Sequence, residues 1–242
     1  MGLRGVKRKR GSEGQSEIVA RSNRQPELVS LLQLIPEFQC RQRDGYKCVL
    51  TGSAMSEVAH IYPYSMLNPS SARPPEFDFW DTLKRFWSDN RIQKWRNAIF
   101  PDQNSADKGV ETCSNLMCLS RDAHGCWAKG YFALKPIQLS DNKKCLEVEF
   151  HWMPQYRYSS KVNILTPPKS SEGLDGRPDI MLFHIPTKRP ICSGDKISLK
   201  TDDPETLPLP HFALLEMQWT LQRVAAMSAA PGIYCEGVRT EN

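Results

Sequence analysis

The sequence predicts an α+β fold, because segments with helical spacing and segments with strand-like alternation fall into separate blocks along the chain. Residues 74–100 carry aromatic side chains at helical spacing. Short alternating or β-branched runs, separated by proline, glycine and serine, dominate the second half. A long apolar segment of helical type, "HFALLEMQWTLQRVAAMS", comes near the end. These blocks indicate helices packed beside antiparallel strands.

Composition narrows the class of protein. The 242-residue chain is 40% hydrophobic and 24% charged, as is usual for a globular protein with a core. We expect an intracellular protein without membrane attachment, because no run approaches the roughly 18 apolar residues of a membrane span and the start lacks a signal-peptide core. We expect the eight cysteines to be reduced thiols, because the chain is long and shows no signal peptide and no dense cysteine framework. The absence of a CxxC pair argues against a zinc site of four cysteines.

The positive charge of the chain is concentrated at its start. Residues 1–25 hold seven basic and two acidic residues, which accounts for the whole net charge of +5. We expect this polar segment to be a disordered tail. Its run Lys7, Arg8, Lys9 and Arg10 fits a nuclear address or a phosphate-binding arm, and it fits a solvated charged terminus equally well. The body is neutral, so affinity for nucleic acid would come from a local patch or from the tail.

The elements expected first along the chain are a helix and a hairpin. Residues 26–35 show an apolar stripe at helical spacing, and Pro36 should end or kink that helix. The segment "RQRDGYKCVLTGS" predicts a turn and a short strand, with residues 58–61 as the returning strand of a hairpin. The aromatic block then predicts an inserted pair of helices with core-facing residues Trp80, Leu83, Phe86, Trp87, Ile92, Trp95 and Ile99.

The second half begins with a strand and a capped helix. The run "NLMCLS" predicts a buried strand, Ser120 an N-cap, and "RDAHGCWAK" a helix that Gly130 ends. Further strands are expected at "YFALKP", "CLEVEFHWMP", "KVNIL", "DIMLFHI" and "KISLK", followed by the connector "TDDPETLPLP" and the final helix.

Three polar residues recur in an order that suits phosphodiester hydrolysis. His60 ends a strand, Asn115 starts the next extended run, and His124 lies in the first turns of a capped helix. A neutral imidazole at His60 can take a proton from water as general base. The amide of Asn115 can position the loop that carries this base. His124 can hold a divalent cation that neutralises developing charge. The two imidazoles are then expected to face each other across a small cleft.

The segments "CVLTG", "EVAHIYPYS" and "NLMCLSRDAHGCWAKGYFALKP" resemble the HNH (His-Asn-His) endonuclease family, in the branch common in filamentous fungi. "FHW", "SGD", "TDDPETLPLP" and "LLEMQWTLQRVAAMS" are similar to the later half of those proteins, and the likeness covers roughly residues 38–230. It implies a ββα-metal (HNH) nuclease core with a helical insertion, a C-terminal β-rich elaboration and a terminal helix.

The resemblance also implies a domain plan, a cofactor and a substrate. Between the tails 1–25 and 231–242, it predicts one HNH-type domain over residues 26–230, with a core at 46–135 and an elaboration at 136–230. It implies one divalent metal ion (Mg²⁺, Mn²⁺ or Zn²⁺) and a nucleic-acid substrate, with DNA favoured.

Two alanines depart from the family pattern. Many HNH enzymes carry Asp or His where this chain has Ala59, and relatives of this branch carry Asp where it has Ala128. Asp122 is the candidate second ligand beside His124, reaching over from the first turn of the helix, and Arg121 is a candidate phosphate contact or a solvated surface arginine.

The sequence therefore supports two functions. One is a metal-dependent HNH endonuclease. The other is a non-nuclease protein on the same scaffold with a degenerate metal site, repurposed for a fungal metabolic pathway or for binding.

Overall fold

The computed structural model describes residues 34–67, 79–101, 109, 111–154, 167 and 169–227. The expected tails, most of the helix predicted over residues 26–35, and the strand predicted at "KVNIL" lie outside the described residues. Among the helices that are described, none is both long and apolar enough to cross a membrane.

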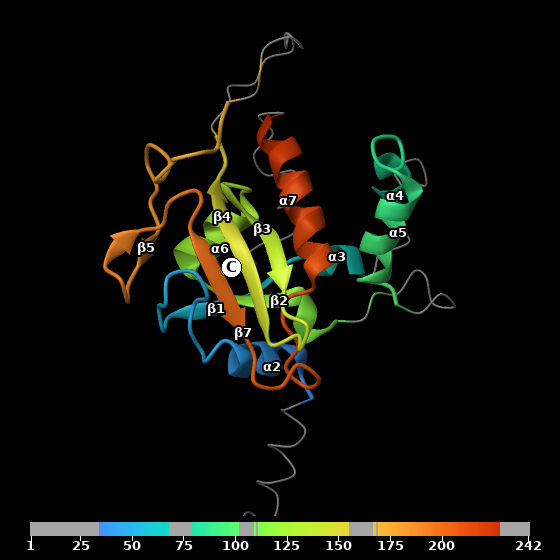
Figure 1. The fold of residues 1–242 in the computed structure, drawn as a ribbon, viewed down its shortest axis with the longest axis horizontal. Coiled ribbons are helices and arrows are strands. Elements are labelled where there is room, and N and C mark those ends of the chain that lie inside the picture. Colours follow the sequence, from blue (N-terminus) through green and yellow to red (C-terminus); the bar gives the residue numbers. More distant parts are fainter. Residues whose placement is uncertain are drawn as a thin grey trace, which may run out of the picture.

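A two-stranded antiparallel sheet and one helix form the centre of the candidate site (Figure 1). Strand β1 (Ser56–His60) pairs with β2 (Leu116–Ser120), with His60 opposite Leu116. Helix α6 (Arg121–Ala128) follows β2 directly, and the side chain of Ser120 accepts a hydrogen bond from Ala123 N as its N-cap. The predicted order of strand, strand and capped helix is thus confirmed.

The prediction that residues 58–61 return to pair with a strand in "RQRDGYKCVLTGS" is wrong. Helix α2 (Pro36–Arg43) occupies the start of that segment, and turns closed by Gly45 and Gly52, both with positive φ, follow it. β1 takes its partner from β2, whose side chains are almost all buried, because pairing with this apolar run removes more surface from water.

Two predictions about local boundaries also change. Pro36 begins helix α2 instead of ending a helix, because its fixed φ and missing N–H are tolerated in a first turn. Asn115 ends the 3-10 helix η2 (Cys113–Asn115) instead of starting the strand, which begins at Leu116.

The described part of the insertion contains three short helices, α3 (Tyr64–Leu67), α4 (Phe79–Leu83) and α5 (Asp89–Asn97). Leu83, Ile92 and Trp95 are buried as predicted, whereas Phe86 is 72% exposed. Its helix ends at Leu83, so the helical spacing that pointed Phe86 inward does not continue to it.

The C-terminal half contributes a larger antiparallel sheet and the last helix. Strands β3 (Phe132–Leu139), β4 (Cys145–Trp152) and β7 (Lys196–Lys200) pair in that order, and α7 (Phe212–Met227) lies against β3 (Figure 1). Of the strand expected at "DIMLFHI", the structure forms only the two-residue strand β5 (Phe183–His184), which pairs with β6 (Arg189–Pro190), and an isolated bridge from Ile180 to Arg177. The architecture is α+β.

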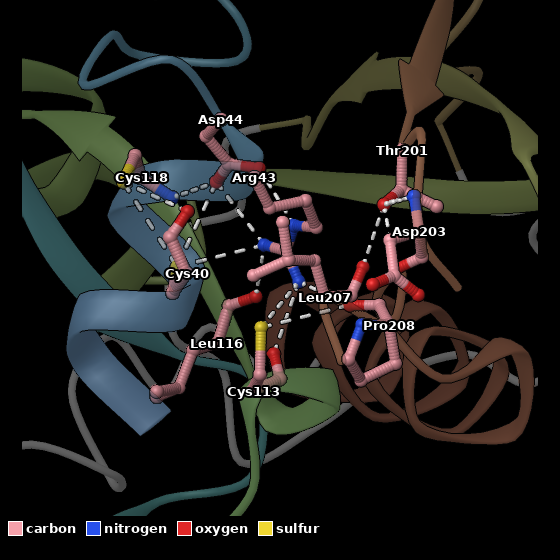
Figure 2. Close-up of polar contacts among 10 residues, drawn as sticks. All are labelled: Cys40, Arg43, Asp44, Cys113, Leu116, Cys118, Thr201, Asp203, Leu207 and Pro208. Carbon is pink, nitrogen blue, oxygen red and sulfur yellow. Dashed lines mark hydrogen bonds and ion pairs between the residues drawn. The ribbon is translucent and has the colours of Figure 1, made fainter. Parts of the chain in front are cut away.

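A buried arginine ties these parts together (Figure 2). The side chain of Arg43 is 0% exposed, and it pairs with Asp44 through Nε and Oδ1 at 2.7 Å. The same guanidinium donates to three backbone carbonyls, those of Cys113 at 3.0 Å, Leu116 at 2.7 Å and Pro208 at 2.7 Å. Arg43 therefore joins α2, the start of β2 and the connector before α7.

The connector is folded so that Pro208 can reach this arginine. The hydroxyl of Thr201 donates to Leu207 O at 2.8 Å and closes the loop between β7 and α7 (Figure 2). Burial alone would lower the pKa of Arg43, but the hydrogen bond and charge of Asp44 outweigh it and raise that pKa. Arg43 thus remains charged in the core.

We expect Arg43→Met to lower the free energy of unfolding by about 3–5 kcal/mol, because it leaves the carboxylate of Asp44 buried without its partner. Urea denaturation followed by tryptophan fluorescence measures the change. Arg85→Met, at an exposed arginine, is the matched control and should change stability little. Equal effects of the two variants would contradict a central place for Arg43.

Candidate functional site

His60 forms an ion pair with a glutamate that the sequence did not indicate. Its Nε2 lies 2.9 Å from Oε2 of Glu111, and both side chains are about one-quarter exposed. A carboxylate is an acceptor only, so Nε2 carries the proton and donates it to Glu111. In the neutral ring, Nδ1 then keeps the free lone pair. His60 is thus held in one tautomer at the end of β1.

The side chain of Asn115 forms hydrogen bonds with the backbone immediately after β1. Its Oδ1 accepts a hydrogen bond from Tyr62 N at 2.8 Å, and its Nδ2 donates to Tyr62 O at 3.0 Å. The backbone adds a third bond, from Ile61 N to Asn115 O at 2.8 Å. Asn115 is almost fully buried, so these bonds are shielded from water. The arrangement fixes the exit of the chain from the strand that His60 ends.

Helix α6 is attached to the same strand end. The indole of Trp127 donates a hydrogen bond to His60 O at 3.0 Å. Helix α6 contacts β1, and its residues Trp127 and Ala123 are buried in the same core as Ala59. His124 of α6 also contacts Glu57, which shares a face of β1 with Ala59. The neighbouring residue Val58 packs instead against the cluster of Cys40, Cys113, Leu116 and Cys118. The two faces of β1 therefore have different surroundings.

On the face covered by α6, His124 also pairs with a glutamate. Its Nδ1 lies 3.1 Å from Oε2 of Glu57, and Oε1 of the same carboxylate accepts a hydrogen bond from Arg121 Nε at 2.9 Å. The hydrogen bonds from His124 and Arg121 lower the pKa of Glu57 below its ordinary value. Glu57, and not the predicted Asp122, is the carboxylate that contacts His124. Asp122 is exposed on the first turn of α6.

The two histidines do not share one group of ligands. In the described part of the chain, neither His60 nor His124 belongs to a cluster of three His, Cys, Asp or Glu side chains whose ligand atoms lie within 4.8 Å of one another. Each histidine pairs instead with a carboxylate of its own, His60 with Glu111 and His124 with Glu57. Glu57 and His60 are three residues apart on a strand, so their side chains leave opposite faces, with about 10 Å of strand between them.

Sequence reasoning missed both glutamates. Glu57 could have been found, because residues 57 and 59 share a face of any strand and Ala59 is the position where a ligand was expected. Glu111 carried no local signal. It comes beside His60 only because the chain returns after the insertion to build η2 and β2.

A second set of potential ligands lies in the Arg43 network (Figure 2). Cys40, Asp44 and Cys118 form the one group of three potential ligand residues found among the described residues. The two sulfur atoms are 3.9 Å apart, and Asp44 Oδ2 accepts hydrogen bonds from Cys118 N at 2.8 Å and Arg43 Nη2 at 3.1 Å.

The position of Arg43 opposes a cation in this group. Arg43 Nη2 also lies 3.5 Å from Cys40 Sγ, so a positive charge already stands against these atoms and the lone pairs of Asp44 Oδ2 are occupied. The hydrogen bond with Cys118 and burial raise the pKa of Cys40, which keeps it a neutral thiol. The group is better explained as structural than as a metal centre.

The geometry can now be compared with known proteins. Residues 48–135 match the model of a family described as HNH endonuclease. No curated protein and no solved structure matches the chain. The matched segment contains β1, β2, α6 and the first half of β3, together with His60, Asn115 and His124. An HNH endonuclease domain is therefore supported for this segment, and with it a nuclease function and a nucleic-acid substrate in general.

We expect Asn115→Ala to lower the free energy of unfolding by about 1–3 kcal/mol, because it leaves the N–H and C=O of Tyr62 buried without side-chain partners. Asn115→Asp should also destabilise, since a carboxylate would face Tyr62 O where the amide now donates. Urea denaturation measures both, with Asn97→Ala on an exposed helix position as control. Variants as stable as the wild type would show that the chain after β1 is held by other contacts.

Thiol reactivity should separate buried from accessible cysteines. Burial raises the pKa of Cys113 and that of Cys126 to about 11. At pH 8 only about one in a thousand of these thiols is ionised, so they should react far more slowly with a disulfide reagent than the half-buried Cys145 and Cys192. Peptide mapping after timed labelling identifies each site. Labelling of Cys113 or Cys126 at the rate of Cys145 in the folded protein would contradict this burial.

Proposed function

We propose that the protein is a metal-dependent HNH endonuclease that hydrolyses phosphodiester bonds of nucleic acid, with DNA as the favoured substrate. The observation that carries the proposal is the His60–Glu111 pair at the end of β1, inside the segment that matches HNH endonucleases. This pair leaves one ring nitrogen of His60 free to accept a proton.

His60 acts as the general base. Its Nδ1 takes a proton from a water molecule, and the resulting hydroxide attacks phosphorus as the bond to the 3′ oxygen breaks. The 3′ oxygen takes a proton from solvent, so the products are a 5′-phosphate and a 3′-hydroxyl. Glu111 holds Nε2–H, and its negative charge stabilises the imidazolium that forms.

Asn115 is a positioning residue in this scheme. It contacts the backbone of Tyr62 and not the substrate, and it keeps the strand end from shifting when His60 becomes charged. An error of about 1 Å in the position of a base can cost a hundredfold in rate, so this rigidity has a direct catalytic value. Trp127 supports the same strand end from α6.

The residues beside α6 fit a divalent cation. Glu57 and His124 present one carboxylate oxygen and one imidazole nitrogen close together, a donor set that suits Mn²⁺ or Zn²⁺ and, less well, Mg²⁺. When bound there, the cation would neutralise charge on the phosphate and on the leaving oxygen. Arg121 is 79% exposed next to this pair, where its guanidinium can contact a phosphate of the substrate.

The alternative is a non-nuclease protein on this scaffold. Ala59 and Ala128 favour it, because neither can bind a metal ion, and Ala59 is fully buried. This alternative predicts a protein that binds a partner or a small molecule without cleaving nucleic acid. It also predicts no dependence of any activity on His60.

Nicking of supercoiled plasmid by the full chain in Mg²⁺, Mn²⁺ or Zn²⁺ tests the proposal. We expect His60→Ala to lower the rate by about 10²–10⁴-fold, which is the usual contribution of a general base. Glu111→Gln keeps the shape of the side chain but not its charge, so it should cause a smaller loss. His184→Ala, at a histidine bonded to Thr187 on the ribbon β5–β6, is the matched control.

The outcome that overturns the proposal is equally defined. If the wild-type protein nicks no faster than His60→Ala in each of the three metals, the chain is not a nuclease of this kind. Cleavage by the wild type that His60→Ala retains in full would show a contaminating enzyme.

A further inference from the structure

Glu57 contacts His124, the candidate cation ligand on α6. It is two residues before Ala59 on β1, so the two side chains leave the same face of the strand. That face is the one covered by α6, which carries His124. Residue 57 is about 7 Å further along the strand from its end than residue 59. Its carboxylate nevertheless reaches the helix, because it contacts His124 in the structure.

The distance between the two side chains suits shared coordination. Glu57 Oε2 and His124 Nδ1 are 3.1 Å apart. Two ligand atoms at about 2.1 Å from one ion and at right angles to each other lie about 3.0 Å apart, which is the edge of an octahedral site. The same separation suits the hydrogen bond that joins the pair in the structure. A cation would take the place of the proton on Nδ1, which passes to solvent.

The exposure of the pair leaves room for the remaining ligands. The side chains of Glu57 and His124 are 44% and 35% exposed, so water or substrate oxygens can complete the coordination. The competing partner of Glu57 is Arg121, whose side chain is much more exposed and which bonds the other carboxylate oxygen, Oε1. Oε2 therefore faces His124 without interference from Arg121.

We propose that Glu57 and His124 together hold the catalytic divalent cation, with Glu57 supplying the carboxylate that neither residue 59 nor Asp122 supplies. The proposal rests on the function proposed above in naming the ion as catalytic, but the binding site itself can be tested alone. It makes β1 the carrier of both the general base, at its last residue, and a metal ligand, at its second residue and on the opposite face.

The test is direct binding of Mn²⁺ to the metal-free full chain, measured by isothermal titration calorimetry without nucleic acid. We expect one site in the wild type and at least about a tenfold loss of affinity in Glu57→Gln and in His124→Ala. Glu57→Asp, which is one methylene shorter, should weaken binding less than Glu57→Gln. Thermal unfolding in EDTA checks that each variant is folded.

Two further variants separate this site from its rivals. Arg121→Gln removes the other partner of Glu57, and it should keep or strengthen Mn²⁺ binding. If it weakens binding as much as Glu57→Gln, the effect comes from a lost ion pair and the proposal is wrong. Cys118→Ser tests the group of Cys40, Asp44 and Cys118, and it should leave binding unchanged. Binding that is lost in Cys118→Ser but kept in Glu57→Gln would also overturn the proposal.

Failure of this proposal and failure of the nuclease function give different results. Mn²⁺ binding that depends on Glu57 and His124, in a protein that nicks no plasmid, supports the ligand pair and refutes the nuclease. Nicking that depends on His60, with Mn²⁺ affinity unchanged in Glu57→Gln, supports the nuclease and refutes this ligand. The absence of Mn²⁺ binding in the wild type refutes the ligand pair outright.

Discussion

The two hydrogen bonds from Asn115 to the backbone of Tyr62 are the constraint on which the candidate site depends. They join the end of β1 to the start of β2 across the whole length of the insertion, and they do so in a buried setting where each bond resists exchange with water. Because the strand end is fixed, the residues that project from it are fixed as well. His60, at that end, meets Glu111, and Glu57, near the start of the same strand, meets His124.

The proposed mechanism gives β1 two tasks, a general base at His60 and a metal ligand at Glu57. Side chains alternate along a strand, so these two residues would not compete for the same space. Each histidine has a glutamate of its own, and the two pairs have different consequences. The carboxylate of Glu111 sets the tautomer of His60, whereas the carboxylate of Glu57 shares its charge between His124 and Arg121.

The support for this site comes from segments far apart in the sequence. The guanidinium of Arg43 links α2 to the carbonyls of Cys113, Leu116 and Pro208, and so couples the small sheet to the connector that leads into α7. The part of the chain after residue 135 therefore contributes to the stability of the small sheet. Its connector supplies an acceptor that keeps a buried charge satisfied beside β2.

Local signals in the sequence determined much of the fold and three residues of the site. Ser120 as N-cap, Gly130 after the last turn of α6, and the apolar run of β2 are short-range patterns, so they could be recognised without the structure. The placement of His60 at a strand end and of His124 on a capped helix followed from them, whereas Asn115 was expected to start a strand and ends a 3-10 helix instead. Only the tertiary structure decided which strand pairs with β1, that Pro36 starts a helix, and that Glu57 and Glu111 are the partners of the two histidines. The physical reason is that pairing and ion-pair partners depend on how the chain returns after a long insertion, and no local propensity records that path.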